Sequence, residues 1–263
     1  MKKEVQILLT AFLFYTRINI ARFVNYEEEN LSKCTKYLPL VGWLVGGLSA
    51  LMYVLCNLAL SPAVAVILSI LISVLITGAF HEDGLADSCD GFGGGWTKDR
   101  ILTIMKDSRI GTYGTVSLII LFGLKIALLI DAYVLLNDSI VIILFTMSAH
   151  AVSRYVASIF IYTHSYTRDN VTSKVKPVAE NSNVLMLIVG GILAFIPFLL
   201  LGYLTTNYFL LLAIIPMYVT KIFLGKFFKK WIDGYTGDTL GATQQITEIV
   251  FYVSILILWK FTL

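Results

Sequence analysis

Long apolar stretches separated by short polar segments dominate the hydropathy pattern of this 263-residue chain. A helix needs roughly 20 mostly apolar residues to cross about 30 Å of hydrocarbon. Seven stretches reach this length and are predicted as membrane-spanning helices: residues 39–60, 62–80, 111–136, 139–162, 184–205, 208–228 and 246–263. The pattern therefore predicts an all-α fold, a polytopic bundle of about seven transmembrane helices.

An eighth apolar stretch, residues 5–16, is too short to cross the bilayer comfortably. We interpret it as an interfacial or re-entrant helix, with a tilted span as the alternative. No change of composition, low-complexity linker or internal repeat divides the chain. Residues 1–263 are therefore predicted to form a single integral-membrane domain.

Composition and charge agree with a membrane protein. With 57% hydrophobic and 14% charged residues, the chain has more apolar surface than one soluble core can bury. The connections at 57–62, 137–139 and 205–207 contain no Lys or Arg, and the other connections hold nearly all the positive charge. The positive-inside bias then predicts a multi-pass protein of the cell (inner) membrane with a cytoplasmic N-terminus. A net charge of +3 predicts no nucleic-acid partner, and the sequence leaves a homo-oligomer open.

Four carboxylates interrupt the apolar pattern where the second predicted span ends. If that span continues as a helix, Asp83, Asp87 and Asp90 stand at positions i, i+4 and i+7 and share one face. A solvated helix end paired with nearby cations is the alternative interpretation. Acidic side chains at a membrane boundary are costly enough that a functional role is the better expectation.

The chemistry of these residues favours a metal. Carboxylates crowded on one face repel each other and need a cation nearby. Oxygen ligands favour a hard divalent ion, and Mg²⁺ also bridges to phosphate oxygens. We therefore expect Asp83, Asp87 and Asp90 to bind Mg²⁺, with Glu82 as a supporting or second-metal ligand. His81 is interpreted as an interfacial side chain.

Several cations are candidates for binding an anionic substrate. Lys106 and Arg109 lie at the entrance of the third span, and the planar guanidinium fork of Arg109 suits a phosphate. Arg154 lies inside the fourth span, one turn from His150, with a phosphate, a cluster acid or a structural ion pair as its expected partner. Arg17 follows the short N-terminal helix and is expected to return to the same mouth.

A second polar segment covers residues 233–245. Asp233 and Asp238 lie among glycines, and we predict a compact loop whose acids supply further metal or hydroxyl contacts. Mg²⁺-binding carboxylates beside Lys and Arg favour the transfer of a phosphorus-linked or pyrophosphate-linked group. No Ser-His-Asp order, zinc spacing or Walker motif competes with this interpretation.

Four segments resemble sequences of one family. Residues 81–91 read HEDGLADSCDG and residues 104–114 read IMKDSRIGTYG, and both are similar to the hallmark of the cobalamin synthase family, the adenosylcobinamide-GDP ribazoletransferases. Residues 14–18 and 234–242 resemble the same family, so the likeness covers nearly the whole chain in order. One departure is Asn19, where the family pattern would place a proline.

The resemblance implies the last joining step of cobamide assembly. A ribose hydroxyl of α-ribazole, or of its 5′-phosphate, would attack the cobinamide-proximal phosphorus of adenosylcobinamide-GDP, and GMP would leave. In that family the reaction depends on Mg²⁺. The implied roles are as follows: metal binding and catalysis by Asp83, Asp87 and Asp90 with Glu82, diphosphate binding by Lys106, Arg109 and Arg154, and nucleoside or second-ion placement by Asp233 and Asp238.

Three alternatives stay open at this point. A CDP-alcohol phosphotransferase performs similar Mg²⁺ chemistry, but its acidic motif carries an Arg where this chain has Asp87. A membrane prenyltransferase uses two Asp-rich loops with a different spacing. A divalent-cation transporter would place its acids near mid-bilayer on broken helices, whereas these acids are predicted at an edge beside the glycine run 91–95.

Overall fold

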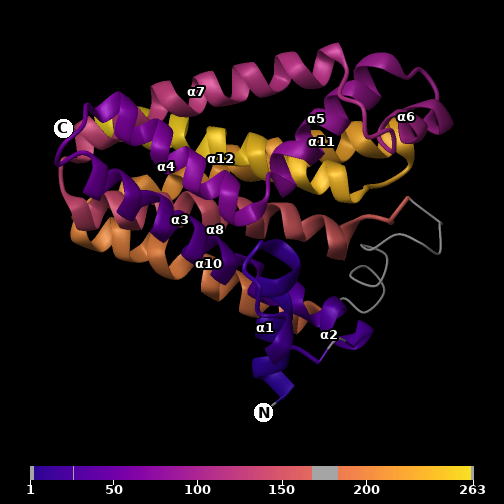
Figure 1. Ribbon diagram of the computed structural model, residues 1–263, viewed down its shortest axis with the longest axis horizontal. Coiled ribbons are helices and arrows are strands. Elements are labelled where there is room, and N and C mark those ends of the chain that lie inside the picture. The colour runs from indigo at the N-terminus through magenta and orange to yellow at the C-terminus, as the bar shows by residue number, and fades with distance from the viewer. Residues whose placement is uncertain (1–2, 26, 168–182, 262–263) are drawn as a thin grey trace.

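The computed structural model describes residues 3–25, 27–167 and 183–261, and most of them are helical (Figure 1). Within these ranges, extended pairing is limited to one isolated bridge between Tyr166 and Tyr235. The α-helices and 3₁₀ helices (η) are, in chain order, α1 (Lys3–Tyr15), η1 (Ala21–Phe23), α2 (Glu28–Lys33), η2 (Cys34–Tyr37), α3 (Leu38–Cys56), α4 (Pro62–Thr77), α5 (Phe80–Gly94), α6 (Lys98–Ile104), α7 (Thr112–Leu136), α8 (Ser139–Thr163), α10 (Val184–Leu204), η3 (Tyr208–Ala213), α11 (Ile214–Ile232) and α12 (Gly237–Lys260). The predicted all-α fold is confirmed.

Six helical segments of the described chain are long and apolar enough to cross a membrane. They are Glu28–Cys56, which contains α2, η2 and α3, then α7, α8 and α10, then Tyr208–Ile232, which contains η3 and α11, and finally α12. The bent pair α4 and α5 would make a seventh. The prediction of a polytopic bundle is therefore confirmed. The start of the last span was predicted wrongly, because α12 begins at Gly237 and not at residue 246.

The second predicted span does not continue as one straight helix through the acidic cluster, which was the condition considered above. α4 ends at Thr77, and α5 starts at Phe80 with its axis turned by 88°. Gly78 and Ala79, which join them, have φ angles of 66° and 58°, in the left-handed region. The left-handed conformation costs a non-glycine residue roughly 1–2 kcal/mol. The acids therefore lie on a helix of their own, set across the direction of α4.

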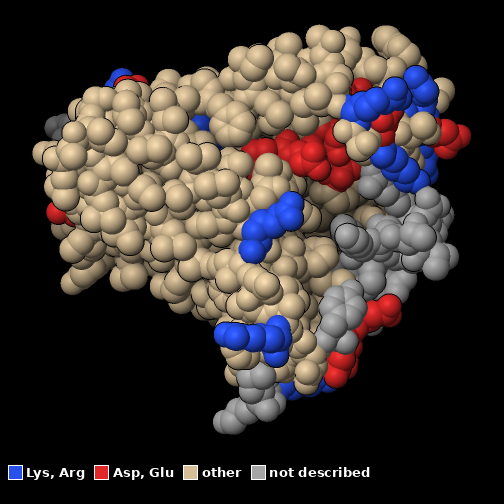
Figure 2. Space-filling model, in the orientation of Figure 1, with Lys and Arg blue, Asp and Glu red and all other residues tan. Residues whose placement is uncertain are grey.

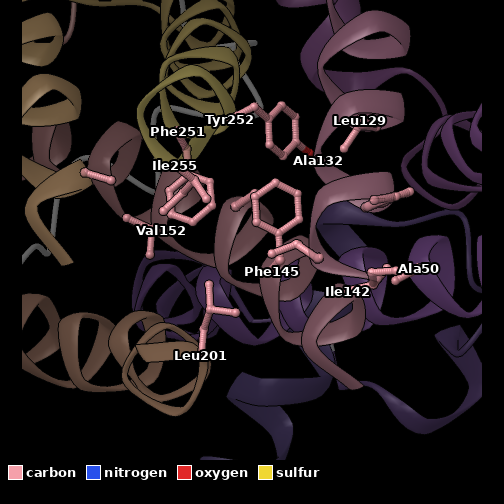
Figure 3. Packing of buried hydrophobic residues seen from close by; sticks show 14 of the residues in the cluster. Ala50, Leu129, Ala132, Ile142, Phe145, Val152, Leu201, Phe251, Tyr252 and Ile255 are labelled. Carbon is pink, nitrogen blue, oxygen red and sulfur yellow. The ribbon is translucent and has the colours of Figure 1, made fainter. Parts of the chain in front are cut away.

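Helix α8 lies at the centre of the bundle and packs most extensively against α3, α10 and α12. Figure 3 shows its Phe145 among side chains from these neighbours, including Leu201 of α10 and Phe251 of α12. The rings of Phe145 and Phe251 have centroids 5.8 Å apart. This apolar centre fixes α12 against α8 and so sets the position of the polar first turns of α12.

Glycines bring α3 and α8 into backbone contact. A Cβ atom at Gly42 would lie 2.6 Å from the carbonyl oxygen of His150, and one at Gly46 would lie 2.7 Å from that of Thr146. Small residues four positions apart permit this close approach between helices in a membrane.

We therefore expect Gly42→Ala to destabilise the fold by about 1–3 kcal/mol, because its methyl group meets backbone atoms that cannot rotate away. Thermal unfolding of the detergent-solubilised protein measures the effect. Gly123→Ala on α7 is the matched control, since no atom lies within 4 Å of a Cβ built there. Equal unfolding temperatures for the two variants would contradict the proposed close contact.

Helix α1 covers the N-terminal part of the fold and is absent from the candidate spans. Its Ile7 and Ala11 are buried in a cluster with Leu31, Cys34 and Leu38. Thirteen residues of helix rise about 20 Å, which is short of the hydrocarbon thickness. The interfacial or re-entrant placement of this helix stays a prediction.

Candidate functional site

Three of the four clustered carboxylates line one cavity. Glu82, Asp83 and Asp87 of α5 face a space of about 230 Å³ that α4, α7 and the loop before α7 also enclose. The loop contributes Ser108 and Ile110. Figure 2 shows the acidic side chains gathered in a hollow beneath α7, at the end of the molecule where α5 and α6 lie. We call this space the acid cavity.

The carboxylates of α5 differ in their surroundings. Asp83 is exposed and Asp87 is partly buried, and their spacing of four residues places them on one face, as predicted. Asp90 is buried and does not line the acid cavity, because its carboxylate faces the N-terminus of α7. In the described part of the chain, no three His, Cys, Asp or Glu side chains are grouped closely enough to hold a metal ion by themselves.

Glu82 is fixed from one side by α12. Its side chain is 6% exposed, and Gln245 Nε2 donates a hydrogen bond of 3.0 Å to Glu82 Oε1. Glu82 Oε2 is buried without a hydrogen-bond partner. The two helices can approach this closely because α5 presents Gly84 to α12, where a Cβ would lie 2.8 Å from the carbonyl oxygen of Asp238. One carboxylate oxygen is therefore held by the protein, and the other has its hydrogen-bonding capacity unused.

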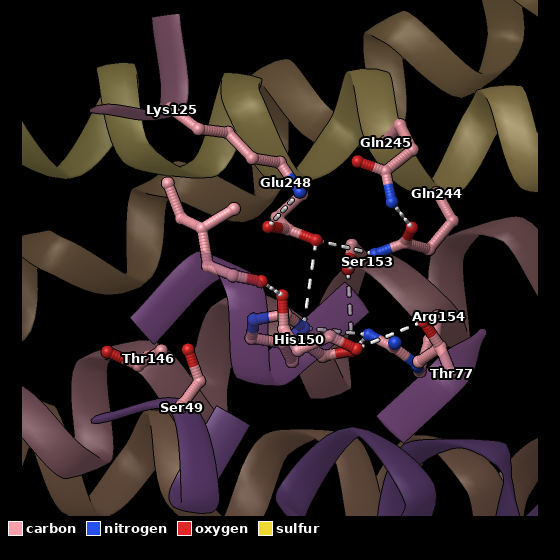
Figure 4. A network of polar contacts seen from close by, with 12 residues as sticks. Ser49, Thr77, Lys125, Thr146, His150, Ser153, Arg154, Gln244, Gln245 and Glu248 are labelled. Atoms are coloured by element: carbon pink, nitrogen blue, oxygen red, sulfur yellow. Dashed lines mark hydrogen bonds and ion pairs between the residues drawn. The ribbon is translucent and has the colours of Figure 1, made fainter. Parts of the chain in front are cut away.

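Behind Glu82, a buried polar network extends into the bundle (Figure 4). Gln245 Nε2 also donates to Gln244 Oε1, and Gln244 Nε2 donates to Glu248 Oε2, both at 2.7 Å. Lys125 of α7 pairs with Glu248 at 2.8 Å, and both side chains are at least 97% buried. Tyr252 donates to the same carboxylate at 2.9 Å. The network fixes the side chains that hold Glu82.

Gln244, Gln245 and Tyr252 were not predicted as site residues, and neither Lys125 nor Glu248 was predicted to contribute to the site. A signal was present, because Gln244, Glu248 and Tyr252 recur every four residues along one predicted helix face. What could not be seen is their partner on α7. Lys125 lies 123 residues before Glu248 in the chain and meets it through the packing of α7 on α12.

Arg154 does not enter the acid cavity. Its Nη1 donates to Nδ1 and to the carbonyl oxygen of His150, both at 3.0 Å, and its Nε is buried without a partner. Because a guanidinium can only donate, His150 Nδ1 accepts this bond and carries no proton. The 3.7 Å contact between His150 Nδ1 and Glu248 Oε2 is therefore not an ion pair. Among the described residues, no ion pair joins Arg154 to an acidic side chain, and its role as a phosphate contact stays a prediction.

Arg154 instead borders a second, small cavity that it shares with His81 and Gln244. This cavity measures about 30 Å³, enough for a water molecule to reach the unpartnered nitrogens Arg154 Nε and His81 Nδ1. His81 is 5% exposed, so its interpretation as an interfacial side chain is wrong. The bend before α5 turns its side chain inward.

The predicted substrate cations Lys106 and Arg109 do not line the acid cavity, but they belong to the loop that supplies Ser108 and Ile110 to it. Both are exposed. The guanidinium of Arg109 donates two hydrogen bonds to Asp107, at 2.6 Å from Nη2 and 3.0 Å from Nε. This pairing lowers the pKa of Asp107 to about 2, so the carboxylate stays ionised at any physiological pH. In this structure the guanidinium of Arg109 is therefore paired with an ionised carboxylate.

The second polar segment is a loop only over residues 233–236, and the predicted loop is wrong from Gly237 onward, where α12 begins. Thr236 caps α12, since Thr239 N donates to Thr236 Oγ1 at 3.2 Å and Thr236 N donates to Thr239 Oγ1 at 2.9 Å. Sequence reasoning missed this box because Thr occupies the position where Glu or Gln is usual. Asp238 lies in the first turn of α12, beside α5. Asp233 ends α11 and pairs with Lys98 of α6 at 3.0 Å, so it lies outside the acid cavity.

Arg17 returns to the bend between α4 and α5, close to the predicted mouth. Its backbone N–H donates to the carbonyl oxygen of Ile76 at 2.7 Å, and its side chain covers Gly78 so closely that a Cβ there would lie 2.3 Å from Arg17 Nε. Arg17 is exposed and does not line the acid cavity. Arg17 therefore contacts the bend that precedes α5.

Comparisons with known proteins agree over nearly the whole chain. The family model for cobalamin-5-phosphate synthase matches residues 7–256. A protein named adenosylcobinamide-GDP ribazoletransferase from Shewanella frigidimarina is 42% identical over 257 residues, which cover 97% of this chain and 95% of that protein. A protein of the same name from Shewanella baltica is 43% identical over 258 residues, with the same coverage. No solved structure matches the chain. The resemblance read from the motifs is thus confirmed, and the chain belongs to the cobalamin-5-phosphate synthase family.

Proposed function

We propose that this chain transfers the cobinamide phosphoryl group of adenosylcobinamide-GDP to α-ribazole or α-ribazole 5′-phosphate, and releases GMP. The product is adenosylcobalamin or its 5′-phosphate. Family membership and relatives that carry the name adenosylcobinamide-GDP ribazoletransferase over 97% of the chain support this reaction. The alternatives of a CDP-alcohol phosphotransferase, a prenyltransferase or a transporter gain no support from these matches.

The observation that carries the proposal is the acid cavity. It gathers three carboxylates of α5 beside a loop with two exposed cations, Lys106 and Arg109. A diphosphate could meet these cations while the carboxylates face the reacting phosphorus through a metal. The guanidinium of Arg109 can exchange Asp107 for a phosphate, which accepts the same bidentate pair of hydrogen bonds.

We propose Mg²⁺ as the metal, with Asp83 and Asp87 as its ligands and Glu82 in support. Magnesium keeps several waters and is usually bound by one or two carboxylates plus substrate phosphates. Two aspartates one helical turn apart, and an unpartnered oxygen on Glu82, fit that pattern without a third protein ligand. When bound, the ion would neutralise charge on the diphosphate as GMP departs.

We also propose that the acid cavity opens toward the cytoplasm of the cell (inner) membrane. The cations Lys98, Lys106 and Arg109 lie near this end, and the helix connections at 57–61 and 137–138 hold no Lys or Arg. The positive-inside bias then directs the cavity inward. Water-soluble substrates would reach it from the cytosol.

The test is an assay of the purified protein in liposomes with adenosylcobinamide-GDP, α-ribazole and Mg²⁺. We expect GMP to be released in step with the corrinoid product, and neither product to form when Mg²⁺ is removed with a chelator. A CDP-alcohol offered as donor is the control and should release no CMP. Divalent-cation flux into the liposomes without any GMP would instead identify a transporter.

A further inference from the structure

Asp90 differs from the other acids of α5 because the protein itself occupies both of its oxygens. Gly111 N donates to Oδ2 at 2.7 Å, and Gly114 N donates to Oδ1 at 2.8 Å. The side chain is buried, with 8% of the residue exposed. These two N–H groups belong to the start of α7, where a helix leaves its first N–H groups unpaired and favours negative charge.

The sequence around these amides leaves room for the carboxylate. Gly111 has φ −96° and ψ −175°, an extended conformation that any residue can adopt. Glycine suits position 111 for steric reasons, and not for its backbone conformation. A Cβ there would lie 2.4 Å from Asp90 Oδ1, and the three atoms nearest to it all belong to Asp90. A Cβ at Gly114 would lie 2.4 Å from Asp90 Oδ2. Both glycines make room for one side chain.

The attachment also fixes a wall of the acid cavity. Ser108 and Ile110 line that cavity opposite Asp83 and Asp87, and Gly111 is the next residue in the chain. We infer that Asp90 is a positioning residue, which holds the loop 108–110 against the carboxylates of α5, and that it is not a magnesium ligand. The part of this inference that concerns the reaction rests on the proposed function, whereas the attachment itself does not.

Hydrogen–deuterium exchange and Mg²⁺ titration separate the two roles. In Asp90→Ala, we expect exchange over residues 111–118 to accelerate at least about tenfold, because buried hydrogen bonds to a charged acceptor are lost. GMP release should slow with an unchanged Mg²⁺ concentration at half-maximal rate. Asp83→Asn is the matched comparison, and it should raise the Mg²⁺ requirement while exchange over 111–118 stays as in the wild type.

A second pair of variants tests the fit of Gly111. Gly111→Ala should accelerate the same exchange in the wild-type background, where its methyl group meets the carboxylate, and should have little further effect in Asp90→Ala. If Asp90→Ala does not fold, Asp90→Asn, which keeps one acceptor oxygen, takes its place and should show an intermediate exchange rate.

Unchanged exchange over 111–118 without the Asp90 carboxylate, or a raised Mg²⁺ requirement like that of Asp83→Asn, would overturn the inference. The exchange measurement needs neither substrate nor metal. Its result therefore stands even if the protein releases no GMP, and the failure of the proposed function would be recognised separately.

Discussion

Replacing Asp83 or Asp87 by asparagine is expected to slow GMP release by about two to four orders of magnitude, the scale on which charged groups act on a transferring phosphorus. Asparagine keeps the shape of the side chain and removes the charge. Both residues line the acid cavity and neither is fully buried, so the fold should tolerate the change. The Mg²⁺ concentration needed for half-maximal GMP release should rise in both variants.

The control for charge is Asp99→Asn. Asp99 is an exposed acid on α6, near the same end of the molecule, and it does not line the acid cavity. Its replacement should leave both the rate and the Mg²⁺ requirement within about twofold of the wild type, as expected for an exposed charge away from the chemistry. Turnover of Asp83→Asn at the wild-type rate, with the wild-type Mg²⁺ requirement, would remove the basis of the proposed metal site.

The second large effect concerns stability. Glu248→Gln leaves the ammonium group of Lys125 buried opposite a neutral amide, and breaking a buried pair in this way costs about 3–5 kcal/mol. The loss should appear as a lower midpoint of thermal unfolding in detergent. Glu4→Gln is the matched control, because Glu4 pairs with Lys36 at the surface, where such pairs contribute at most about 1 kcal/mol.

Removing both charges distinguishes a missing partner from damaged packing. In Lys125→Met with Glu248→Gln, neither member of the pair leaves a buried charge without its partner, and the amide can still hydrogen-bond with Gln244 and Tyr252. This double variant should regain most of the stability that Glu248→Gln loses. A double variant less stable than the single one would show that the charges are not the cause.

Most of the fold could be predicted from hydropathy alone. Spanning helices such as α7 and α8 are long and apolar, and their expected limits agree with the structure within a few residues. The bend before α5 could not be predicted in this way, because Gly78 is one glycine in an apolar run and Ala79 prefers a helix. In the structure, Arg17 contacts this bend with its side chain at Gly78 and its N–H at the carbonyl oxygen of Ile76, a tertiary contact that no local pattern indicates.

The candidate site was partly predictable for a similar reason. Spacing along one helix correctly brought Asp83 and Asp87 together, because that relation is local. The same spacing put Asp90 with them, but two amides from another helix bind that carboxylate instead. The contact between Gln245 and Glu82 joins residues 163 positions apart, and no local pattern indicates such a pair.

The bend at Gly78 and Ala79 joins two short helices with different surfaces. The exposed surface of α4 is apolar and suits contact with lipid, because it carries Val64, Ile67, Leu71 and Leu75. The carboxylates belong to α5, whose axis leaves that of α4 at 88°. The bend therefore separates the apolar outer surface of one helix from the anionic surface of the next, although only two residues join them.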